Sequence, residues 1–491
     1  MDKHLPLFIF LPLTAAAILF LARGIREQAK DILVSIVTGS LFLLSLFTAA
    51  RTVGAGMQIF HAGGGNLLVA DGLAVFFQII VNLLLVAVSV YSAGYMESAA
   101  KTTYYGLLLL LATGLNGVIL AGDLFTIFVF LELTVIPAYI LVALPLKGES
   151  FEASFKYAML GALSSLSILL GIAFVYADTG TLSLAAIGLH VSPPGTLPEQ
   201  LAMVLLFAGL ALKATLVPFH AWVPDAYSAA PSPVSALFSG AVSKVAGIYV
   251  LLRLSFNVFG VHPAIFTIFL WLGAASILIG VILALYQWDL KRLLAYHSIS
   301  QIGYIFLGIG TGSPLGILGG LFHLANHSVF KSLLFLNAGS LEHATGTRNL
   351  KELGGVARRM PVTGTTSLIA SLSISGIPPL NGFWSKLLII AGCVQVSHYG
   401  FGFVAAGASI LTLASFLKVQ RYAFRGYLKD TLTRINEVPM TMRIPMIVLS
   451  ILCVSMGLLL LPGLDTFFLS PALHTLTSGK AYALTVTGLL K

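Results

Sequence analysis

The sequence is poor in charge and in cysteine. Charged residues make up 9% of its 491 residues, against about 25% in ordinary globular domains. This excludes a water-soluble globular protein. The two cysteines, Cys393 and Cys453, lie in different apolar runs without CxxC spacing, so they form neither an iron–sulfur ligand set nor a disulfide framework. There is also no GxGxxG after a strand and no HExxH. The sequence therefore predicts no cofactor, no metal site and no redox chemistry within this chain.

Long apolar runs dominate what remains. Hydrophobic residues make up 58% of the chain, and runs near twenty residues long match helices that cross a hydrocarbon core about 30 Å thick. Their hydrophobicity is unbroken, unlike the alternation of barrel strands. We therefore expect an all-α polytopic membrane protein whose first run is a retained span rather than a signal peptide. Fourteen spans are predicted, near residues 5–22, 32–50, 69–95, 104–120, 124–145, 157–177, 200–219, 232–252, 264–286, 293–310, 315–338, 362–397, 403–417 and 444–462.

The net charge of +9 is explained by topology rather than by nucleic-acid binding. With these spans, eighteen of the 27 lysines and arginines fall in connections on one side, five on the other and four inside spans. The positive-inside rule places the rich side in the cytoplasm. We therefore expect a multi-pass protein of the cell membrane with both termini external.

Seven titratable side chains stand inside or beside predicted spans. Glu132 is the one acid of eighteen that lies neither in a connection nor at a span end. An ionisable residue at such depth marks an ion path by default, because it is costly unless it faces the protein interior or water. The candidates for proton translocation are Glu132, Lys213, Lys244, His323, His327, Lys331 and Lys386.

Less specific explanations exist for each group. Lys213, near a break, could snorkel to the headgroups, whereas Lys244 has apolar sequence on both sides. Glu132 could be a neutral, hydrogen-bonded carboxyl. His323, His327 and Lys331, spaced i, i+4, i+8, share one helix face over about 12 Å, and they could form a proton relay, structural contacts, or a metal or haem site. His297 adds another titratable group.

Two spans are interrupted by proline. The seventh breaks near Pro218, after Lys213, and the twelfth breaks between Gly376 and Gly382, before Lys386. Paired interruptions of this kind indicate a transport site between structural repeats. Because they are five spans apart, spans 4–8 and 9–13 are predicted to be inverted repeats. The predicted divisions of the chain are 1–103, 104–255, 256–425 and 426–491.

The connection from His220 to Val234 is expected to lie on the cytoplasmic side. It is either a proton entrance, or a rigid turn in which Asp225 caps the following helix.

Four segments resemble a known family: LKATLVPFHAWVPDAYSAAPSPVSALFSGAVSKVAGIYVLLR (212–253), AGDLFTIFVFLELTVIPAY (121–139), HLANHSVFKSLLFLNAG (323–339) and SGIPPLNGFWSK (375–386). They are similar to the antiporter-like proton-channel subunits of respiratory complex I, Mrp-type cation/proton antiporters and membrane-bound hydrogenases. The resemblance covers roughly residues 70–425. It implies fourteen helices, two inverted five-helix repeats and broken helices seven and twelve.

The same resemblance implies roles for the candidates. Glu132 and Lys213 would form the carboxylate–lysine pair, Lys244 the connecting lysine, and Lys386 the terminal lysine. The residues of the central relay would be His323, His327 and Lys331. GIPPLNGFWSK and APSPVSALFSG resemble most the D-type component of Mrp antiporters and its counterparts in hydrogenases, and Lys386 stands where one complex I homologue has a glutamate.

The function expected from the sequence is therefore proton translocation by one membrane subunit of a larger complex, beside other membrane subunits and a redox arm. One alternative is a sodium/proton antiporter subunit in which Glu132 is joined by Thr134, Ser164, Ser165 and carbonyls of the broken helices as oxygen ligands. Another is a haem- or quinone-binding subunit that uses His297, His323 and His327.

Overall fold

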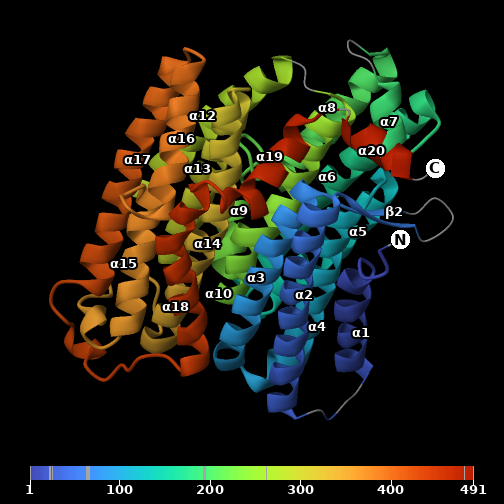
Figure 1. The fold of residues 1–491 in the computed structure, drawn as a ribbon. Coiled ribbons are helices and arrows are strands. Elements are labelled where there is room, and N and C mark those ends of the chain that lie inside the picture. Colours follow the sequence, from blue (N-terminus) through green and yellow to red (C-terminus); the bar gives the residue numbers. More distant parts are fainter. Residues whose placement is uncertain are drawn as a thin grey trace.

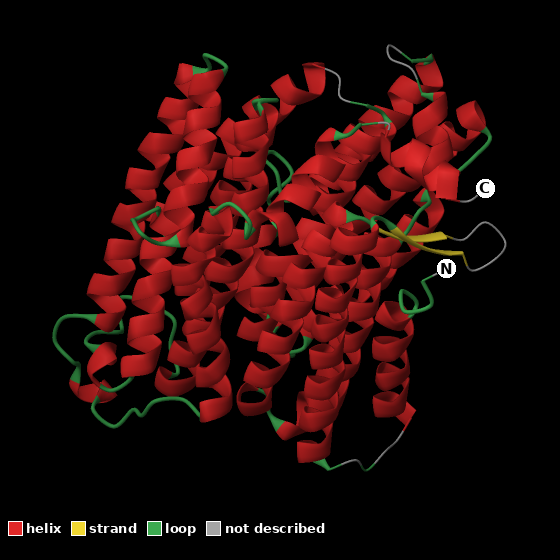
Figure 2. Cartoon of the chain, viewed as in Figure 1, coloured by secondary structure: helices red, strands yellow, loops and turns green. Residues whose placement is uncertain are grey.

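The protein is a bundle of long helices (Figures 1 and 2). A computed structural model describes residues 2–21, 24, 26–61, 67–191, 195–260, 263–479 and 481–489. Within these residues, ten helical segments are long and apolar enough to cross a membrane. They are α2 (Glu27–Ala55), α3 (Gly72–Tyr95), α4 (Ser98–Leu120), α5 (Leu124–Ala143), α6 (Gly148–Thr179), Ser232–Val258, α12 (Pro263–Leu285), α13 (Leu290–Gly310), Tyr399–Phe424 and Met440–Leu460.

Five further helices occupy the remaining predicted spans. They are α1 (Leu7–Leu21), α8 (Leu197–Lys213), α14 (Pro314–Thr345), α15 (Pro361–Ser375) and α16 (Asn381–Gln395). The all-α membrane fold is thus confirmed, while the count of fourteen spans stays a prediction. The end of the first predicted span, residue 22, lies outside the described residues, as do Arg23, Lys480 and Lys491 of the charge census.

Several segments combine more than one helix type. Ser232–Val258 consists of α10 (Ser232–Leu237), the π-helices η1 (Phe238–Val242) and η2 (Lys244–Tyr249), α11 (Val250–Leu252) and the π-helix η3 (Arg253–Val258). Tyr399–Phe424 joins α17 (Tyr399–Val419) to η5 (Gln420–Phe424), and Met440–Leu460 joins α18 (Met440–Ser455) to η7 (Met456–Leu460).

Both predicted helix breaks are confirmed. Helix α8 ends at Lys213, and the chain turns through Pro218 before the short helix α9 (Val223–Ala229). Helix α15 ends at Ser375 and is followed by Gly376, whose φ of 78° is the left-handed conformation that glycine adopts without strain. At the first break the freed amide of Val217 donates to Ser276 Oγ over 3.0 Å, so irregular backbone is satisfied by protein, as a membrane interior requires.

Helix α14 forms the centre of the second half of the bundle. It packs against α13, α15, α16, α10 and α18, and every residue from Gly319 to Leu341 is buried. The segment Ser232–Val258 is buried throughout its apolar window. The candidate residues of both segments therefore lie in the protein interior, whereas α2, α6 and α17 expose apolar faces.

An antiparallel hairpin was not predicted. Strands β1 (Gln58–His61) and β2 (Leu67–Ala70) pair with Gln58 opposite Ala70, so the third span begins later than residue 69. Asp71 sets the start of α3, because its carboxylate accepts a hydrogen bond of 2.9 Å from the Ala74 amide. The described ends of the chain lie on the side of this hairpin (Figure 1).

Helix lengths move several predicted boundaries. The eighth span runs to Val258 instead of residue 252, which places Arg253 inside a helix rather than in a connection. Because α4 begins at Ser98, the predicted divisions after residues 103 and 255 fall within helices. The repeat relation itself stays a prediction. The short helices α7 (Leu184–His190), α19 (Leu469–Thr477) and α20 (Ala481–Leu489) were not expected.

Candidate functional site

Glu132, which is partly exposed, and Lys213, which is buried, lie together with a serine between them. Lys213 Nζ is 4.0 Å from Glu132 Oε1. Ser165, on α6, donates a short hydrogen bond to that carboxylate oxygen and accepts one of 3.2 Å from Lys213 Nζ. The lysine side chain is 4% exposed, so it does not snorkel. The three residues form one hydrogen-bonded unit made by α5, α6 and the end of α8.

The oxygen cage expected for sodium is assembled only in part. Ser165 contacts Glu132, but Ser164 donates to the Gly209 carbonyl over 2.7 Å and Thr134 donates to the Phe130 carbonyl over 2.8 Å. Both hydroxyls are thus held by helix backbone. A cavity of about 10 Å³ adjoins Lys213 between Tyr139 and Trp222, roughly the space that one water needs.

Lys244 lies deeper. Its side chain is fully buried, and the ammonium group makes a short hydrogen bond to the carbonyl of Ser239. Lys244 begins a π-helix, in which backbone hydrogen bonds join residues five apart instead of four. Turns of this kind are frequent at functional sites. An ammonium group has three donors, and a single carbonyl satisfies one of them.

The spacing on α14 places its three candidates as predicted. The rings of His323 and His327 are nearly parallel, with centroids 6.4 Å apart. His323 Nδ1 lies 2.9 Å from Ser385 Oγ on α16, and Lys331 Nζ donates to the Leu294 carbonyl over 2.5 Å. Neither ring nitrogen of His327 has a hydrogen-bond partner among the described residues. The protein groups in the described part of the chain thus leave both nitrogens of His327 free to bond with water.

Lys386 lies at the second break. Its Nζ donates to the Ile374 carbonyl at the end of α15 over 2.8 Å and lies 4.6 Å from the ring centroid of Tyr304. Tyr304 in turn lies 5.5 Å from the His323 ring, centroid to centroid. The break thus frees a carbonyl for the lysine, and an aromatic ring connects that lysine with the histidines.

Electrostatic interactions link the candidates of the second half. His327 interacts with the charges of Lys244, Lys331 and Lys386. Several buried polar atoms along this path have no hydrogen-bond partner in the described part of the chain: His323 Nε2, both nitrogens of His327, Ser328 Oγ and both amide atoms of Gln301. Buried polar groups are normally satisfied by protein or ordered water, so the path from Lys244 to Lys386 is suited to hold water.

Sequence reasoning missed the partners that connect these residues. Tyr304 and Ser385 occur in apolar spans, where an aromatic or a serine is usually a packing residue, and no sequence signal separates them from other such residues. The apolar stretch LSFNVFG after Arg253 could have shown that this arginine is inside a helix. Arg253 is buried and forms an ion pair of 2.7 Å with Asp71.

In the connection from His220 to Val234, the predicted cap by Asp225 is wrong, while the proton entrance stays a prediction. It contains α9, and Asp225 lies in the first turn of that helix instead of capping the next one. Its carboxylate forms ion pairs of 3.0 Å with Lys156 and Arg292. Asp225 therefore ties α9 to α6 and α13 by charge.

His297 and His323, two histidines of the haem or quinone alternative, are held by serines. His297 Nε2 lies 2.8 Å from Ser415 Oγ, and His323 has the Ser385 contact described above. One ring nitrogen of each is therefore engaged within the protein.

Comparisons with known proteins agree with one another. A family model described as "NADH:quinone oxidoreductase/Mrp antiporter, TM" matches residues 121–412. The D subunit of a Na(+)/H(+) antiporter from Alkalihalophilus pseudofirmus is 32% identical over 468 residues, which cover 93% of this chain and 94% of that protein. The N subunit of NADH-quinone oxidoreductase from Desulforudis audaxviator is 35% identical over 414 residues, covering 80% and 82%.

Solved structures show the same similarity. A chain of the Mrp complex from a Dietzia species has a TM-score of 0.91 at 27% identity, covering 99% of this chain and 100% of that one. A chain of the membrane-bound sulfane sulfur reductase, an archaeal respiratory membrane complex, has a TM-score of 0.89 at 27% identity, covering 98% and 99%.

Proposed function

Because the chain belongs to the NADH:quinone oxidoreductase/Mrp antiporter transmembrane family, whose members include antiporter-like membrane subunits, we propose that it carries protons across the cell membrane within a multisubunit complex. The proposed path contains Glu132, Lys213, Lys244, His323, His327, Lys331 and Lys386. The contact of Glu132 with Lys213 through Ser165 is the observation that carries the proposal, since two opposite charges inside apolar helices are costly without a function.

The first step is electrostatic. While Glu132 faces Lys213, the carboxylate favours the ammonium form of the lysine. When the pair separates, the buried ammonium loses its counter-charge, and its proton is released toward Lys244. Because the two groups are coupled, each protonation step belongs to the pair rather than to either residue alone. Lys213 closes α8 at the break, so a small movement of the broken helix would alter the distance.

The second step uses the face of α14. The charge of Lys244 interacts with both His327 and Lys331. A proton that arrives at Lys244 therefore makes protonation of His327 and Lys331 less favourable. The nitrogens of His327 have no partner among the described residues, and its ring centroid lies 6.4 Å from that of His323. Proton transfer between the two rings therefore requires bridging water. The Tyr304 ring lies between His323 and Lys386, which makes Lys386 the far end of the path.

A neighbouring subunit would drive the separation of the pair. The side chain of Glu132 is 30% exposed on a helix that also exposes Phe125, Val129 and Ile136. A carboxylate at such a surface needs cover from protein, because lipid does not solvate it. Relatives occur as subunits of a Na(+)/H(+) antiporter and of NADH-quinone oxidoreductase, which supports a place beside other membrane subunits. We propose that both termini are external.

A sodium/proton exchange function is the second candidate, favoured by the similarity to D subunits of Na(+)/H(+) antiporters. Of the three hydroxyls expected there, that of Ser165 bonds Glu132, whereas those of Thr134 and Ser164 bond helix carbonyls. Sodium would therefore have fewer oxygen ligands at Glu132 than it prefers. For this reason we favour protons as the ion carried by the lysines and histidines.

Glu132→Gln tests the proposal, because it preserves shape and removes the charge. The native complex carrying the variant is reconstituted into liposomes that contain a pH-sensitive dye, and proton uptake is driven by a potassium diffusion potential. We expect severe loss in Glu132→Gln, an intermediate rate in Glu132→Asp, and a normal rate in the control Glu152→Gln, whose exposed partner is Lys156. Wild-type uptake in Glu132→Gln, with the complex intact on a native gel, would remove Glu132 from the path.

A further inference from the structure

A polar seam runs between α2 and α3, away from the lysines and histidines. On α2, Asp31, Thr38, Ser45 and Thr52 recur every seven residues, which is close to two helical turns and places them on one side of the helix. On α3, Gln78, Asn82 and Ser89 also share one side, below Asp71 at the helix start. A regular polar stripe on each of two neighbouring apolar helices is not explained by the proton path.

Contacts fix the register of the two helices. The hydroxyls of Thr38 and Ser89 lie 2.9 Å apart, and Thr52 and Asp71 line the same cavity. Because the helices are antiparallel, seven residues from Thr38 to Ser45 bring α2 to the level of Asn82. The two polar stripes therefore face one another along the length of the bundle.

The seam is closed at one end by direct contacts. Asp31 accepts hydrogen bonds of 2.7 Å from Lys101 and 2.6 Å from Tyr105. The contact between Thr38 and Ser89 lies next along α2. No free space is needed to satisfy these groups, so this half of the seam is packed protein.

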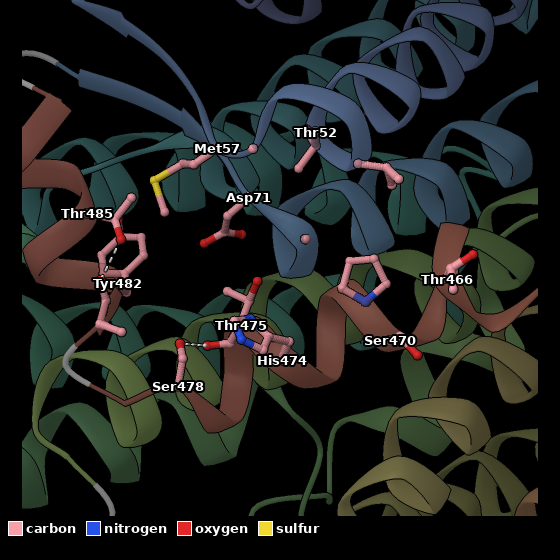
Figure 3. A pocket seen from close by; sticks show the side chains of 15 residues that line it. Thr52, Met57, Asp71, Thr466, Ser470, His474, Thr475, Ser478, Tyr482 and Thr485 are labelled. Carbon is pink, nitrogen blue, oxygen red and sulfur yellow. Dashed lines mark hydrogen bonds between the residues drawn. The ribbon is translucent and has the colours of Figure 1, made fainter. Parts of the chain in front are cut away.

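The other end opens into a cavity. A hollow of about 530 Å³ lies between the end of α2, the start of α3 and the helices α19 and α20 (Figure 3). Asp71 lines it and is held by Arg253 through two hydrogen bonds of 2.7 and 2.8 Å. Figure 3 shows Thr52, Ser470 and Thr475 around the same hollow. The hollow, which lies at the hairpin side of the bundle, is thus bordered by hydroxyl groups and by the carboxylate of Asp71.

Gln78 lies between this cavity and the middle of the seam. Its side chain is fully buried, and neither its amide oxygen nor its amide nitrogen has a hydrogen-bond partner among the described residues. Four residues further on, the amides of Asn82 and Asn116 bond each other reciprocally at 3.1 Å. On the α3 stripe the glutamine is therefore the member without a partner, and on the α2 stripe the Thr52 hydroxyl likewise has none among the described residues.

The two unpaired atoms identify the ligand. A group that satisfies both the oxygen and the NH₂ of an amide must donate one hydrogen bond and accept another, as water does. An alkali cation would use the oxygen alone and would face the NH₂ dipole. The seam also lacks an unpaired carboxylate among its described residues, since Asp31 and Asp71 are engaged by Lys101 and Arg253.

We propose that the seam is a blind-ended water path, which leads from the cavity beside Asp71 past Gln78 to the Asn82–Asn116 pair in the middle of the membrane. Gln78 binds a water molecule of this path through its amide. The half of the seam from the Thr38–Ser89 contact to Asp31 is packed and blocks the passage of ions across the membrane. The path ends beside the helix of Lys244, because Tyr249 of η2 donates to the Ile119 carbonyl of α4 over 2.6 Å. It stands independently of the proton path proposed above.

Cysteine substitutions of two serines test whether one half of the seam contains water and the other half does not. In the assembled complex, with Cys393 and Cys453 replaced by alanine, Ser45→Cys and Ser89→Cys each change one oxygen to sulfur. Ag⁺ is applied from one side of the membrane at a time, and unreacted thiol is then counted with a maleimide after denaturation. We expect Ser45→Cys to react from the hairpin side, and Ser89→Cys and the buried control Ala87→Cys to stay unreacted.

A second variant tests the glutamine. Gln78→Met fills similar volume without polar atoms, so Ser45→Cys in that background should lose its reaction with Ag⁺. An unreactive Ser45→Cys in an intact complex would mean that the seam is dry and only joins the helices. Entry from the opposite side, or an unchanged reaction with Gln78→Met, would also overturn the proposal. Slowing by excess Na⁺ would assign the site to an alkali cation instead.

Discussion

Ser165→Ala removes the hydroxyl that bridges Glu132 and Lys213. Ser165 donates to Glu132 and accepts from Lys213, and hydrogen bonds to charged groups contribute about 1.5–3 kcal/mol each. Once the hydroxyl is gone, Lys213 Nζ and Glu132 Oε1, 4.0 Å apart, can approach and recover part of this energy. We therefore expect the paired state to weaken by about one such bond, or about 10- to 150-fold in equilibrium.

The assay is proton uptake by liposomes containing the native complex, driven by a potassium diffusion potential. Uptake in Ser165→Ala should fall by about tenfold or more, following the lower bound of that range. Ser167→Ala is the matched control, because Ser167 lies on the same helix, is half-buried, and donates to the Leu163 carbonyl rather than to a charged group. Its uptake should be normal.

A double variant separates the bridge from general damage to α6. In the Glu132→Gln background the bridge has no carboxylate to hold, so Ser165→Ala should cause little further loss. If Ser165→Ala transports at the wild-type rate, or if the two losses simply add, the hydroxyl does not couple the pair and the reasoning is refuted.

Three further outcomes are expected. A reporter fused after Lys351 should read as cytoplasmic and one after Gly260 as external; two reporters on one side would contradict the span count. Arg253→Met should lower the unfolding temperature of the solubilised complex, because loss of one partner of a buried ion pair costs about 3–5 kcal/mol; adding Asp71→Asn should recover part of it, and no recovery would contradict the pairing. Glu437 accepts hydrogen bonds from the first amides of α15, so Glu437→Ala should destabilise the complex by about 0.5–2 kcal/mol. The same thermal unfolding measures this loss, and an unchanged unfolding temperature would show that this helix cap is dispensable.

The helices and their breaks could be predicted because membrane burial leaves a direct mark on sequence. Unbroken apolar runs located the spans, and Pro218 and Gly376 located the breaks. Proline lacks the N–H that a helix needs, and glycine adopts the left-handed conformation that ends a helix. The ends of helices were less accurate. The charge of Arg253 lowers the local hydrophobicity, so the predicted span ended before it. The helix instead continues for another five residues and pairs the buried arginine with Asp71.

The titratable residues were also visible in sequence, but their partners were not. Glu132, Lys213 and Lys244 stand out because charge is rare in apolar spans. Tyr304 and Ser385 do not stand out, and their contacts with Lys386 and His323 depend on how distant helices pack. The unpaired amide of Gln78 likewise becomes informative only when its neighbours in space are known.

The lysines at the two breaks test the account most directly. If Lys213 and Lys386 take and release protons, arginine cannot replace them, because a guanidinium stays protonated at accessible pH. The measurement is proton uptake by the reconstituted complex with Lys213→Arg, Lys386→Arg and the two alanine variants, each checked for assembly on a native gel. The account predicts strong loss in all four, and full uptake in both arginine variants would show that a fixed charge suffices and would contradict proton transfer through these lysines.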